Sequence, residues 1–584
     1  MKKTGNIVDW ILLKRVLKYS NPYKKKLFYA ALSAILLAIL GPLRPWLINF
    51  AIDNYIIVSN LEMLAKATLL LFLMLFAEGF FQFYYMFLST WIGQNVIRDI
   101  RSQIFQHIIS LRMKYFDNTQ VGTLVTRTIS DIETISDIFS QGLLVIIAEL
   151  LKLILVLVFM FYTSFKLTIV TLITIPFLLI ATAWFKRNIK SAFKDVRTQV
   201  SKLNAFVQER IIGMKIVQIF NKEESEFNNF KEINIMHRDA NIRSIFYYAV
   251  FFPIVEILSA LAIALVIWSG SISIIKSSGV TIGELVAFIL YIYMMFRPIR
   301  QLADRFNVLQ MGIVGSERVF KILDTDQKIT NDGKLKFDGT NGNISFENVS
   351  FYYKNKQWVL KNINFFVENN KTLALIGHTG SGKTSIANLI LKFYESQRGK
   401  ILIGNNNIES YTLNSLRKSI SYVQQEVFLF SDTIMNNVKM YDNTIKNNDV
   451  EKAAKELGIH DFITSLPNSY EYILGERGIT LSVGQRQLIA FLRVYIRNPK
   501  IIILDEATSS IDSESEELLQ AALKKMSINR TIIIIAHRLS TITGADKIIL
   551  LEKGNIIESG NHQTLIDLNG KYFEMYSKQK NMNL

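Results

Sequence analysis

The chain has 584 residues, of which 50% are hydrophobic and 20% are charged, and its formal net charge is +17. This composition is too apolar for a disordered chain or an ordinary soluble protein. Because the apolar residues are concentrated in the first half, we expect a membrane part followed by a soluble part. The sequence contains no cysteine, which excludes disulfides, thiolate metal ligands and cysteine nucleophiles.

The first predicted element is a short amphipathic helix. Between residues 7 and 19, apolar positions alternate with Lys14, Arg15 and Lys18 at helical spacing. Asn21-Pro22 then predicts a break in the helix, so we favour an interfacial helix over residues 7–19. The alternative is that this segment is the start of the first membrane span.

Six apolar runs of about the length needed to cross 30 Å of hydrocarbon follow. They lie near Leu27 to Phe50, Ala65 to Phe87, Gly142 to Tyr162, Leu167 to Trp184, Ile245 to Trp268 and Ile282 to Phe296. The first run is too long for a cleaved signal peptide, so we expect it to remain as an anchor. The basic residues that precede it place the N-terminus in the cytoplasm, and an even number of spans returns the chain there before about residue 300.

Two long segments between the spans, about 91–141 and 185–243, keep helical periodicity instead of becoming polar. An out-and-back pair of helices of about 24 residues each would extend about 36 Å from the membrane. We therefore expect two stalks, each of which contacts another part of the protein.

Ionisable residues within the predicted spans are costly and point to function or to pairing. They are Arg44, Glu78, Glu149, Lys152 and Glu256. Glu149 and Lys152 are three residues apart on one helix, so a local ion pair is at least as good an explanation as a substrate role. Glu78 and Glu256 are candidates for a cavity lining.

After a first domain over residues 1–323, the segment 324–342 has no apolar period and is predicted to be a linker. Strands and helices then alternate over residues 343–584, with strands expected at 344–353, 359–367 and 371–376 and a helix at 383–394. This order is typical of an α/β domain with a parallel sheet. The predicted fold is thus an α-helical membrane domain of six spans with long cytoplasmic extensions, followed by an α/β domain.

The third of these strands leads into the sequence G-x-x-x-x-G-K-[ST]. Its residues are Gly377, His378, Thr379, Gly380, Ser381, Gly382, Lys383 and Thr384, followed by Ser385. The glycines let backbone N–H groups converge on a polyphosphate at the positive end of the following helix, Lys383 reaches the β and γ phosphates, and Thr384 can hold Mg²⁺. The alternative, a plain glycine turn, does not account for the strand-loop-helix context.

A second acidic motif follows the β-branched run 501–504, where Asp505 and Glu506 come at the expected carboxyl end of a buried strand. Asp505 suits Mg²⁺, and Glu506 suits polarising a water molecule for attack on the γ-phosphate. With the phosphate loop, this pair predicts that the second half is an α/β P-loop ATPase domain.

One further run resembles the signature motif of ATP-binding cassette (ABC) proteins: Leu481, Ser482, Val483, Gly484 and Gln485. Gln425 is similar to the glutamine of their Q-loop, Asp512 to the aspartate of their D-loop, and His537 to their switch histidine. Tyr353 stands where the family places the aromatic residue that stacks on adenine. The order and spacing of these motifs after six spans resemble a half-transporter of the bacterial multidrug and lipid exporter family. Val483 departs from the usual glycine, at a position whose side chain need not face the nucleotide.

The resemblance implies a dimer in which ATP lies between the phosphate loop of one subunit and the signature of the other. It also implies that Glu506, His537 and Gln425 act in catalysis, and that Thr384, Gln425 and Asp505 hold Mg²⁺. Residues 115–131 and 209–221 are similar to the two coupling loops, and we expect the first to contact the ATPase domain near Gln425. We expect a multi-pass protein of the bacterial inner membrane whose ATPase domain is cytoplasmic.

The sequence therefore predicts ATP-driven export or flipping of a hydrophobic or amphipathic compound, a drug or a lipid. The aromatic residues of the second span would suit such a substrate, although lipid contact explains most of them equally well. Alternatives are an ATP-gated channel or regulatory membrane protein on the same scaffold, an importer, and one subunit of a heterodimeric exporter. Expected partners are membrane lipid and a second half-transporter, with a homodimer favoured, and no nucleic acid.

Overall fold

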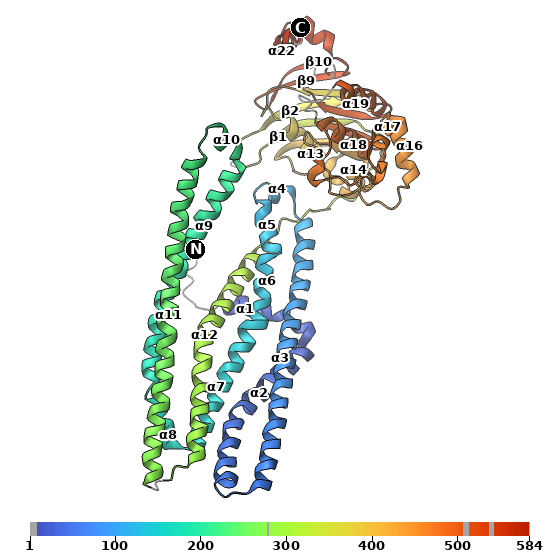
Figure 1. Cartoon of the computed structure of the whole chain (residues 1–584). Helices are drawn as coiled ribbons and strands as arrows, with labels where there is room; N and C mark the ends of the chain where they lie inside the picture. Colours follow the sequence, from blue (N-terminus) through green and yellow to red (C-terminus); the bar gives the residue numbers. More distant parts are fainter. Residues whose placement is uncertain (1–8, 277–278, 355, 506–512, 537–541, 583–584) are drawn as a thin grey trace. The chain divides into compact units, whose positions relative to one another are not determined.

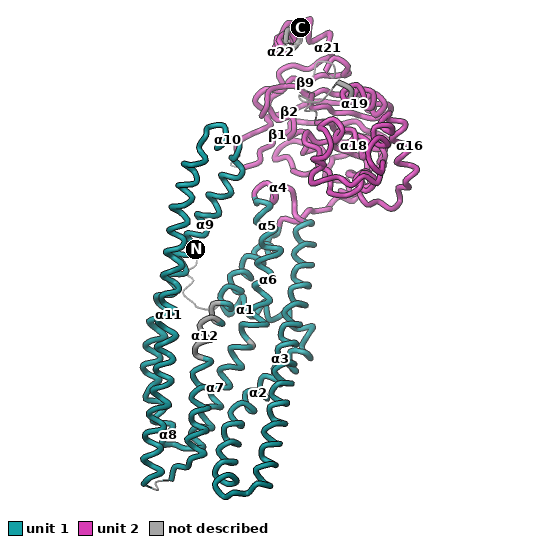
Figure 2. Tube along the Cα trace, in the orientation of Figure 1, with its two compact units in different colours: residues 1–110, 119–326 teal, residues 111–118, 327–584 magenta. Residues whose placement is uncertain are grey.

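The computed structural model describes residues 9–276, 279–354, 356–505, 513–536 and 542–582. The chain forms two compact units, one comprising residues 1–110 and 119–326 and the other residues 111–118 and 327–584 (Figure 2). The first unit is helical and the second is α/β (Figure 1). The structure therefore confirms the predicted fold class.

The helices of the first unit are long and mostly apolar. They are α1 (Trp10–Lys18), α2 (Lys24–Ala51), α3 (Leu61–Ile109), α5 (Val121–Thr128), α6 (Ser130–Asp137), α7 (Leu143–Thr163), α8 (Phe165–Leu172), α9 (Ile175–Ile212), α10 (Met214–Ile219), α11 (Glu223–Ile275) and α12 (Ile282–Leu323), with short π-helical stretches at Ile52–Ile56 and Ile138–Gly142. Among the described residues, five helical stretches are long and apolar enough to cross a membrane: 21–56, 61–109, 121–163, 165–212 and 223–275. They contain the first five predicted spans, and the sixth predicted run lies in α12.

The predicted stalks are continuations of the spans. Helix α11 has 53 residues, so at 1.5 Å per residue it is about 80 Å long, far more than a bilayer requires. It packs along α9, which has 38 residues, and α10 lies at the turn between them (Figure 1). The segments predicted as stalks are therefore mostly helical: α3, α9 and α11 continue from their spans, whereas the chain returns to α7 through the shorter helices α5 and α6.

Helix α1 is the amphipathic helix predicted for residues 7–19, and its first described turn is capped by the Asp9 carboxylate, which accepts hydrogen bonds from the backbone N–H groups of Ile11 and Leu12. Two of its apolar side chains, Leu13 and Val16, are buried, whereas Trp10 and Ile11 are exposed. Its position at a membrane interface stays a prediction.

The α/β unit contains two sheets. The four-stranded sheet has the order β2-β1-β4-β5, with β1 (Ile344–Phe351), β2 (Leu360–Val367), β4 (Arg398–Ile403) and β5 (Asn406–Asn407). The six-stranded sheet has the order β10-β9-β3-β8-β7-β6, with β3 (Thr372–Ile376), β6 (Ile420–Val423), β7 (Ile501–Asp505), β8 (Thr531–Ile535), β9 (Lys547–Glu552) and β10 (Asn555–Gly560).

The predicted parallel sheet is present, but the first two predicted strands lie outside it. β1 and β2 pair antiparallel in the smaller sheet, because the connection over residues 352–359 is too short for the crossover that a parallel pair requires. β3, β8, β7 and β6 do pair in parallel, and β9 adds to β3 in the same direction. The phosphate-loop strand β3 therefore lies inside the parallel sheet, as predicted.

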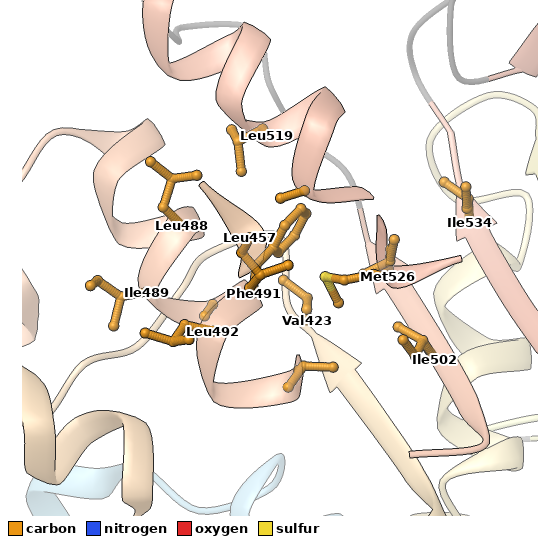
Figure 3. Close-up of a cluster of buried hydrophobic side chains, with 14 of the residues drawn as sticks. Val423, Leu457, Leu488, Ile489, Phe491, Leu492, Ile502, Leu519, Met526 and Ile534 are labelled. Atoms are coloured by element: carbon orange, nitrogen blue, oxygen red, sulfur yellow. The ribbon is translucent and has the colours of Figure 1, made fainter. Parts of the chain in front are cut away.

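Helices cover both faces of the larger sheet. They are α13 (Lys383–Ile390), α14 (Leu413–Ser419), α15 (Ile434–Lys439), α16 (Asn447–Leu457), α17 (His460–Ser465), α18 (Val483–Tyr495), α19 (Ser513–Met526), α21 (His562–Asp567) and α22 (Lys571–Met582). On one face Ile502 of β7, Leu488 of α18 and Met526 of α19 belong to one buried hydrophobic cluster (Figure 3). On the other face Ile501 and Ile503 of the same strand pack in a second core. Burial of both faces explains the unbroken apolar run before Asp505.

The boundary between the units falls within the predicted linker, between Asp326 and Gln327. Beyond it the segment lies on the α/β unit, where Phe337 is buried and the Leu335 backbone N–H donates to the Ser410 carbonyl. The sequence did not predict that this segment packs on the α/β unit, because the contact consists of one apolar side chain and several backbone hydrogen bonds.

Candidate functional site

The phosphate loop connects β3 to α13 and depends on its glycines. Gly377, Gly380 and Gly382 have φ angles of +143°, +81° and +108°, which side-chain-bearing residues rarely adopt. A Cβ added to Gly377 would lie 2.1 Å from the carbonyl oxygen of Leu551. The chain therefore folds tightly between the end of the strand and the first turn of the helix, which leaves His378 and Thr379 exposed at the tip.

Lys383 lies at the centre of this loop. Its Nζ donates hydrogen bonds to the carbonyl oxygens of Gly377, at 2.6 Å, and His378, at 3.0 Å. Burial lowers the pKa of Lys383, and the nearby Asp505 carboxylate opposes that shift. The ammonium group is thus positioned by the loop itself, close to where the helix begins.

One buried hydroxyl of the loop fits an anionic ligand. The Oγ of Ser381 is buried and, among the described residues, has no hydrogen-bond partner. Such groups are rare in proteins and require a partner. A phosphate oxygen at this loop would supply an acceptor, so the residues present fit a nucleotide.

Thr384 and Asp505 meet at the carboxyl end of the parallel sheet. The hydroxyl of Thr384 lies 3.4 Å from Oδ2 of Asp505, which is buried at the end of β7. A hydroxyl and a carboxylate are the oxygen ligands that Mg²⁺ prefers. Gln425, the third predicted metal ligand, is exposed after β6, and no hydrogen bond among the described residues joins it to Thr384 or Asp505.

Tyr422 joins the site, although the sequence did not indicate it. Its hydroxyl donates to Oδ2 of Asp505 at 3.1 Å. Burial raises the pKa of Tyr422, and the Asp505 carboxylate raises it further, so the phenol keeps its proton and orients the carboxylate. Only the register between strands could have indicated this contact: β6 and β7 pair in parallel, and Tyr422 lies opposite Ile503, two residues before Asp505.

Tyr353 is held beside the phosphate-loop helix. Its hydroxyl donates to the Oγ of Ser385 at 3.0 Å and accepts from the side-chain amide of Asn388 at 3.2 Å. Its ring packs edge-to-face against Phe351 and Tyr394, with centroids 4.7 and 4.9 Å away. The residue predicted to stack on adenine therefore lies next to the phosphate loop on a preformed aromatic support.

The signature run forms the start of α18. Ser482 caps this helix, since its Oγ accepts from the Gln485 N–H at 3.2 Å while the Gln485 side chain accepts from the Ser482 N–H at 3.0 Å. Leu481 and Gly484 are buried, whereas the Val483 side chain is exposed. The N-terminus of a helix of 13 residues is thus presented at the surface of the unit.

Arg493 ties the signature helix to the segment after Gln425. The guanidinium group of this α18 residue donates to the carbonyl oxygens of Asn437, at 2.9 Å, and Phe428, at 3.2 Å. Burial lowers the pKa of Arg493 to about 10. This connection was also not evident from the sequence, because the two segments are far apart along the chain.

Three predicted residues, Glu506, Asp512 and His537, lie outside the described residues. The strands that precede Glu506 and His537 are β7 and β8, which pair in parallel with Asp505 opposite Ile535.

A segment between the long helices, residues 111–118, belongs to the α/β unit. Arg112 donates to the carbonyl oxygen of Lys328 and the hydroxyl of Thr330, and it forms an ion pair of 3.2 Å with Glu395. Arg112 precedes the first predicted coupling loop, residues 115–131, and the segment 111–118 overlaps the start of that loop. The expected contact of the loop near Gln425 stays a prediction.

Comparison with known proteins matches both parts of the chain to one family. Residues 27–299 match the family described as ABC transporter transmembrane region, and residues 360–509 match the family described as ABC transporter. A putative ABC transporter ATP-binding protein, exp8, of Streptococcus pneumoniae is 38% identical over 576 residues, 98% of each chain. A putative multidrug export ATP-binding/permease protein, YgaD, of Bacillus subtilis is 34% identical over 581 residues, 98% of this chain and 100% of its own.

An uncharacterized ABC transporter ATP-binding protein of Bacillus subtilis, YknV, is 36% identical over 98% of this chain and 95% of its own. The likeness thus extends over the helical membrane domain and the ATP-binding domain together. The chain therefore belongs to the ABC transporters, as a multi-pass exporter half-transporter that hydrolyses ATP to drive transport across a membrane.

Proposed function

We propose that the protein exports or flips a hydrophobic or amphipathic compound, a drug or a lipid, from the cytoplasmic side of the bacterial inner membrane. The observation that carries the proposal is a phosphate-binding loop on a chain that also holds the membrane helices. Lys383 lies within the glycine loop and Thr384 meets Asp505 beside it. Relatives that match along their whole length include proteins named for putative multidrug export.

We assign the residues of the site as follows. Lys383 and the loop N–H groups bind the phosphates, and Tyr353 stacks on the adenine. Thr384, Asp505 and Gln425 hold Mg²⁺, which would neutralise charge that develops on the phosphates. Glu506 polarises the attacking water, and His537 contributes to stabilising the transition state.

Working as a dimer is part of the proposal. The signature helix presents Ser482 and its first N–H groups outward from the unit, which suits a γ-phosphate held by a facing subunit. The second predicted coupling loop, residues 209–221, exposes a run of large apolar side chains: Ile211, Ile212, Ile216, Ile219 and Phe220 are each more than 60% exposed. Apolar side chains gathered in this way require a covering partner, which we assign to the ATPase domain of a second half-transporter.

Transport then follows from closure of the two ATPase domains. ATP that contacts both subunits stabilises only the closed state, and this difference shifts the membrane domains to the outward-facing state. To shift the transporter from a largely inward-facing to a largely outward-facing population, ATP must stabilise the outward-facing state by about 5 kcal/mol relative to the inward-facing state. Hydrolysis removes that difference and resets the transporter.

The test is ATP-dependent uptake of a hydrophobic fluorescent dye into inside-out vesicles that contain the protein. We expect uptake with ATP and none with the Lys383→Ala variant, which lacks the phosphate-binding ammonium group. ATP-dependent ion conductance without uptake of any amphipathic compound would favour an ATP-gated channel instead.

A heterodimeric exporter is the second candidate, and Val483 is the observation that favours it. Its side chain is exposed at the start of the signature helix, where the family has glycine. The family resemblance associates variation at this position with subunits of heterodimeric exporters.

A further inference from the structure

The charged side chains of the membrane domain converge at one point of α2. Arg44 forms an ion pair of 3.2 Å with Glu78 of α3. A Cβ added to Gly41, one turn earlier on α2, would lie 3.7 Å from the Glu78 carboxylate and 3.4 Å from Cε of Lys152 on α7. Three ionisable groups from three helices therefore surround the Gly41 backbone.

This cluster contains two basic side chains, Arg44 and Lys152, and only one acidic side chain, Glu78. Arg44 and Glu78 pair with each other, but no ion pair or hydrogen bond joins Lys152 to any other residue in the part of the chain that the structure describes. The local pair between Glu149 and Lys152, which their spacing allowed, is not formed within 4.0 Å among these residues.

The position of Lys152 makes its charge costly. It lies at the middle of α7, nine residues after Leu143 and eleven before Thr163. At 1.5 Å per residue these are about 14 and 17 Å from the two ends of a helix that just spans the hydrocarbon. Ionisable groups at such depth face the interior of the bundle or a water-filled path, and they pair with another group.

The backbone beside the cluster is also prepared for a polar ligand. Pro45 has no N–H, so the carbonyl group of Gly41 lacks its usual helical donor. The neighbouring Pro42 carbonyl accepts a hydrogen bond from the buried Tyr291 hydroxyl of α12 at 3.1 Å, which fixes this part of α2 against the bundle. The Arg44 and Glu78 side chains remain 37% and 20% exposed, so the cluster is reachable.

We propose that Arg44, Lys152 and Glu78 form a binding site for the single negative charge of an amphipathic anion, such as a carboxylate or phosphate group on an apolar tail. The ligand's charge pairs with Lys152, and Arg44 contributes a second donor while Glu78 keeps it in place. The surrounding apolar helices hold the tail. This inference rests on the proposed function, because it makes the exported compound a monoanionic amphiphile.

The test compares two fluorescent probes with the same tail, dansyl-undecanoic acid and its methyl ester. Binding to the full-length protein in nanodiscs of neutral lipid is measured at about pH 8.5, far above the pKa of an ordinary carboxyl group. We expect the acid to bind the unmodified protein about 10- to 100-fold more tightly than the ester, as one charge-assisted contact allows. Equal binding of the two probes, or no binding of the acid, would overturn the inference without any variant.

Variants then locate the site. Lys152→Gln should remove the preference for the acid and leave ester binding unchanged. Glu78→Gln should tighten acid binding, because it removes the competing negative charge while its amide oxygen can still accept a hydrogen bond from Arg44. Lys66→Gln is the matched control, because Lys66 pairs with Glu62 on the exposed first turns of α3. A purely structural role for Lys152 and Glu78 would change the binding of both probes together, which would contradict the proposal.

Dye uptake separates this inference from the proposed function. ATP-driven uptake of a neutral dye together with equal binding of acid and ester overturns the anion site and leaves export standing. The opposite result is acid-specific binding that Lys152→Gln abolishes, together with no ATP-driven uptake of any compound. That result supports the anion site and contradicts the proposed export.

Discussion

Glu506 follows Asp505, whose carboxylate lies within reach of the Thr384 hydroxyl at the end of the parallel sheet. If Glu506 polarises the attacking water, Glu506→Gln keeps the shape of the side chain and removes the base. We expect ATP turnover to fall by about 10² to 10⁴ while ATP binding is retained. The measurement is steady-state hydrolysis beside equilibrium binding of labelled ATP, and near-normal hydrolysis would remove Glu506 from this role.

Tyr353 offers a prediction that separates its ring from its hydroxyl. Stacking contributes about 1 to 3 kcal/mol, so Tyr353→Ala should raise the KM for ATP about 5- to 150-fold, whereas Tyr353→Trp should be nearly silent. Tyr353→Phe loses only the hydrogen bonds to Ser385 and Asn388, and it should leave KM within about threefold of the parent while lowering stability by about 1 kcal/mol. A rise in KM for the Phe variant as large as for the Ala variant would contradict stacking.

At the scale of elements, residues 111–118 carry the chain from α3 into the α/β unit and back to α5. Arg112 makes most of the polar contacts of this segment, including its ion pair with Glu395. We expect Arg112→Ala to keep basal ATP hydrolysis and to reduce dye uptake about tenfold or more, because the segment then moves independently of the ATPase domain.

Lys114→Ala is the control for this prediction, since Lys114 lies in the same segment with an exposed side chain. Both variants are assayed for hydrolysis and uptake in the same vesicle preparation. Parallel loss of hydrolysis and uptake in Arg112→Ala would indicate general destabilisation instead of uncoupling.

Periodicity and local motifs predicted the elements well, but they could not predict which elements pair. The phosphate loop was evident because its residues are contiguous from Gly377 to Thr384, and apolar runs located the spans. The antiparallel pairing of β1 with β2 and the bond from Tyr422 to Asp505 were not evident, because they depend on register between strands. Likewise, spacing on one helix paired Glu149 with Lys152, whereas packing between helices paired Arg44 with Glu78.

At the scale of the whole molecule, one chain holds one phosphate loop and one signature helix, so two complete sites require two subunits. We favour a homodimer, because Lys383, Gln425, Ser482, Gly484, Glu506 and His537 are all present. Expression of this chain alone should then give dimers that hydrolyse ATP, measured by light scattering and phosphate release. An inactive chain that regains activity only on co-expression with another half-transporter would establish the heterodimer.

Helix α11 contains a proline, Pro253, that divides it into two parts of different length. The 22 residues after Pro253 measure about 33 Å, close to the thickness of the hydrocarbon, and the 30 residues before it measure about 45 Å. Since proline removes one helical hydrogen bond and permits a kink, it provides a pivot for the longer arm. A rotation of about 10° at Pro253 would then sweep the far end of that arm through about 8 Å. A small rotation at Pro253 would therefore produce a large displacement at the end of α11 that adjoins α10.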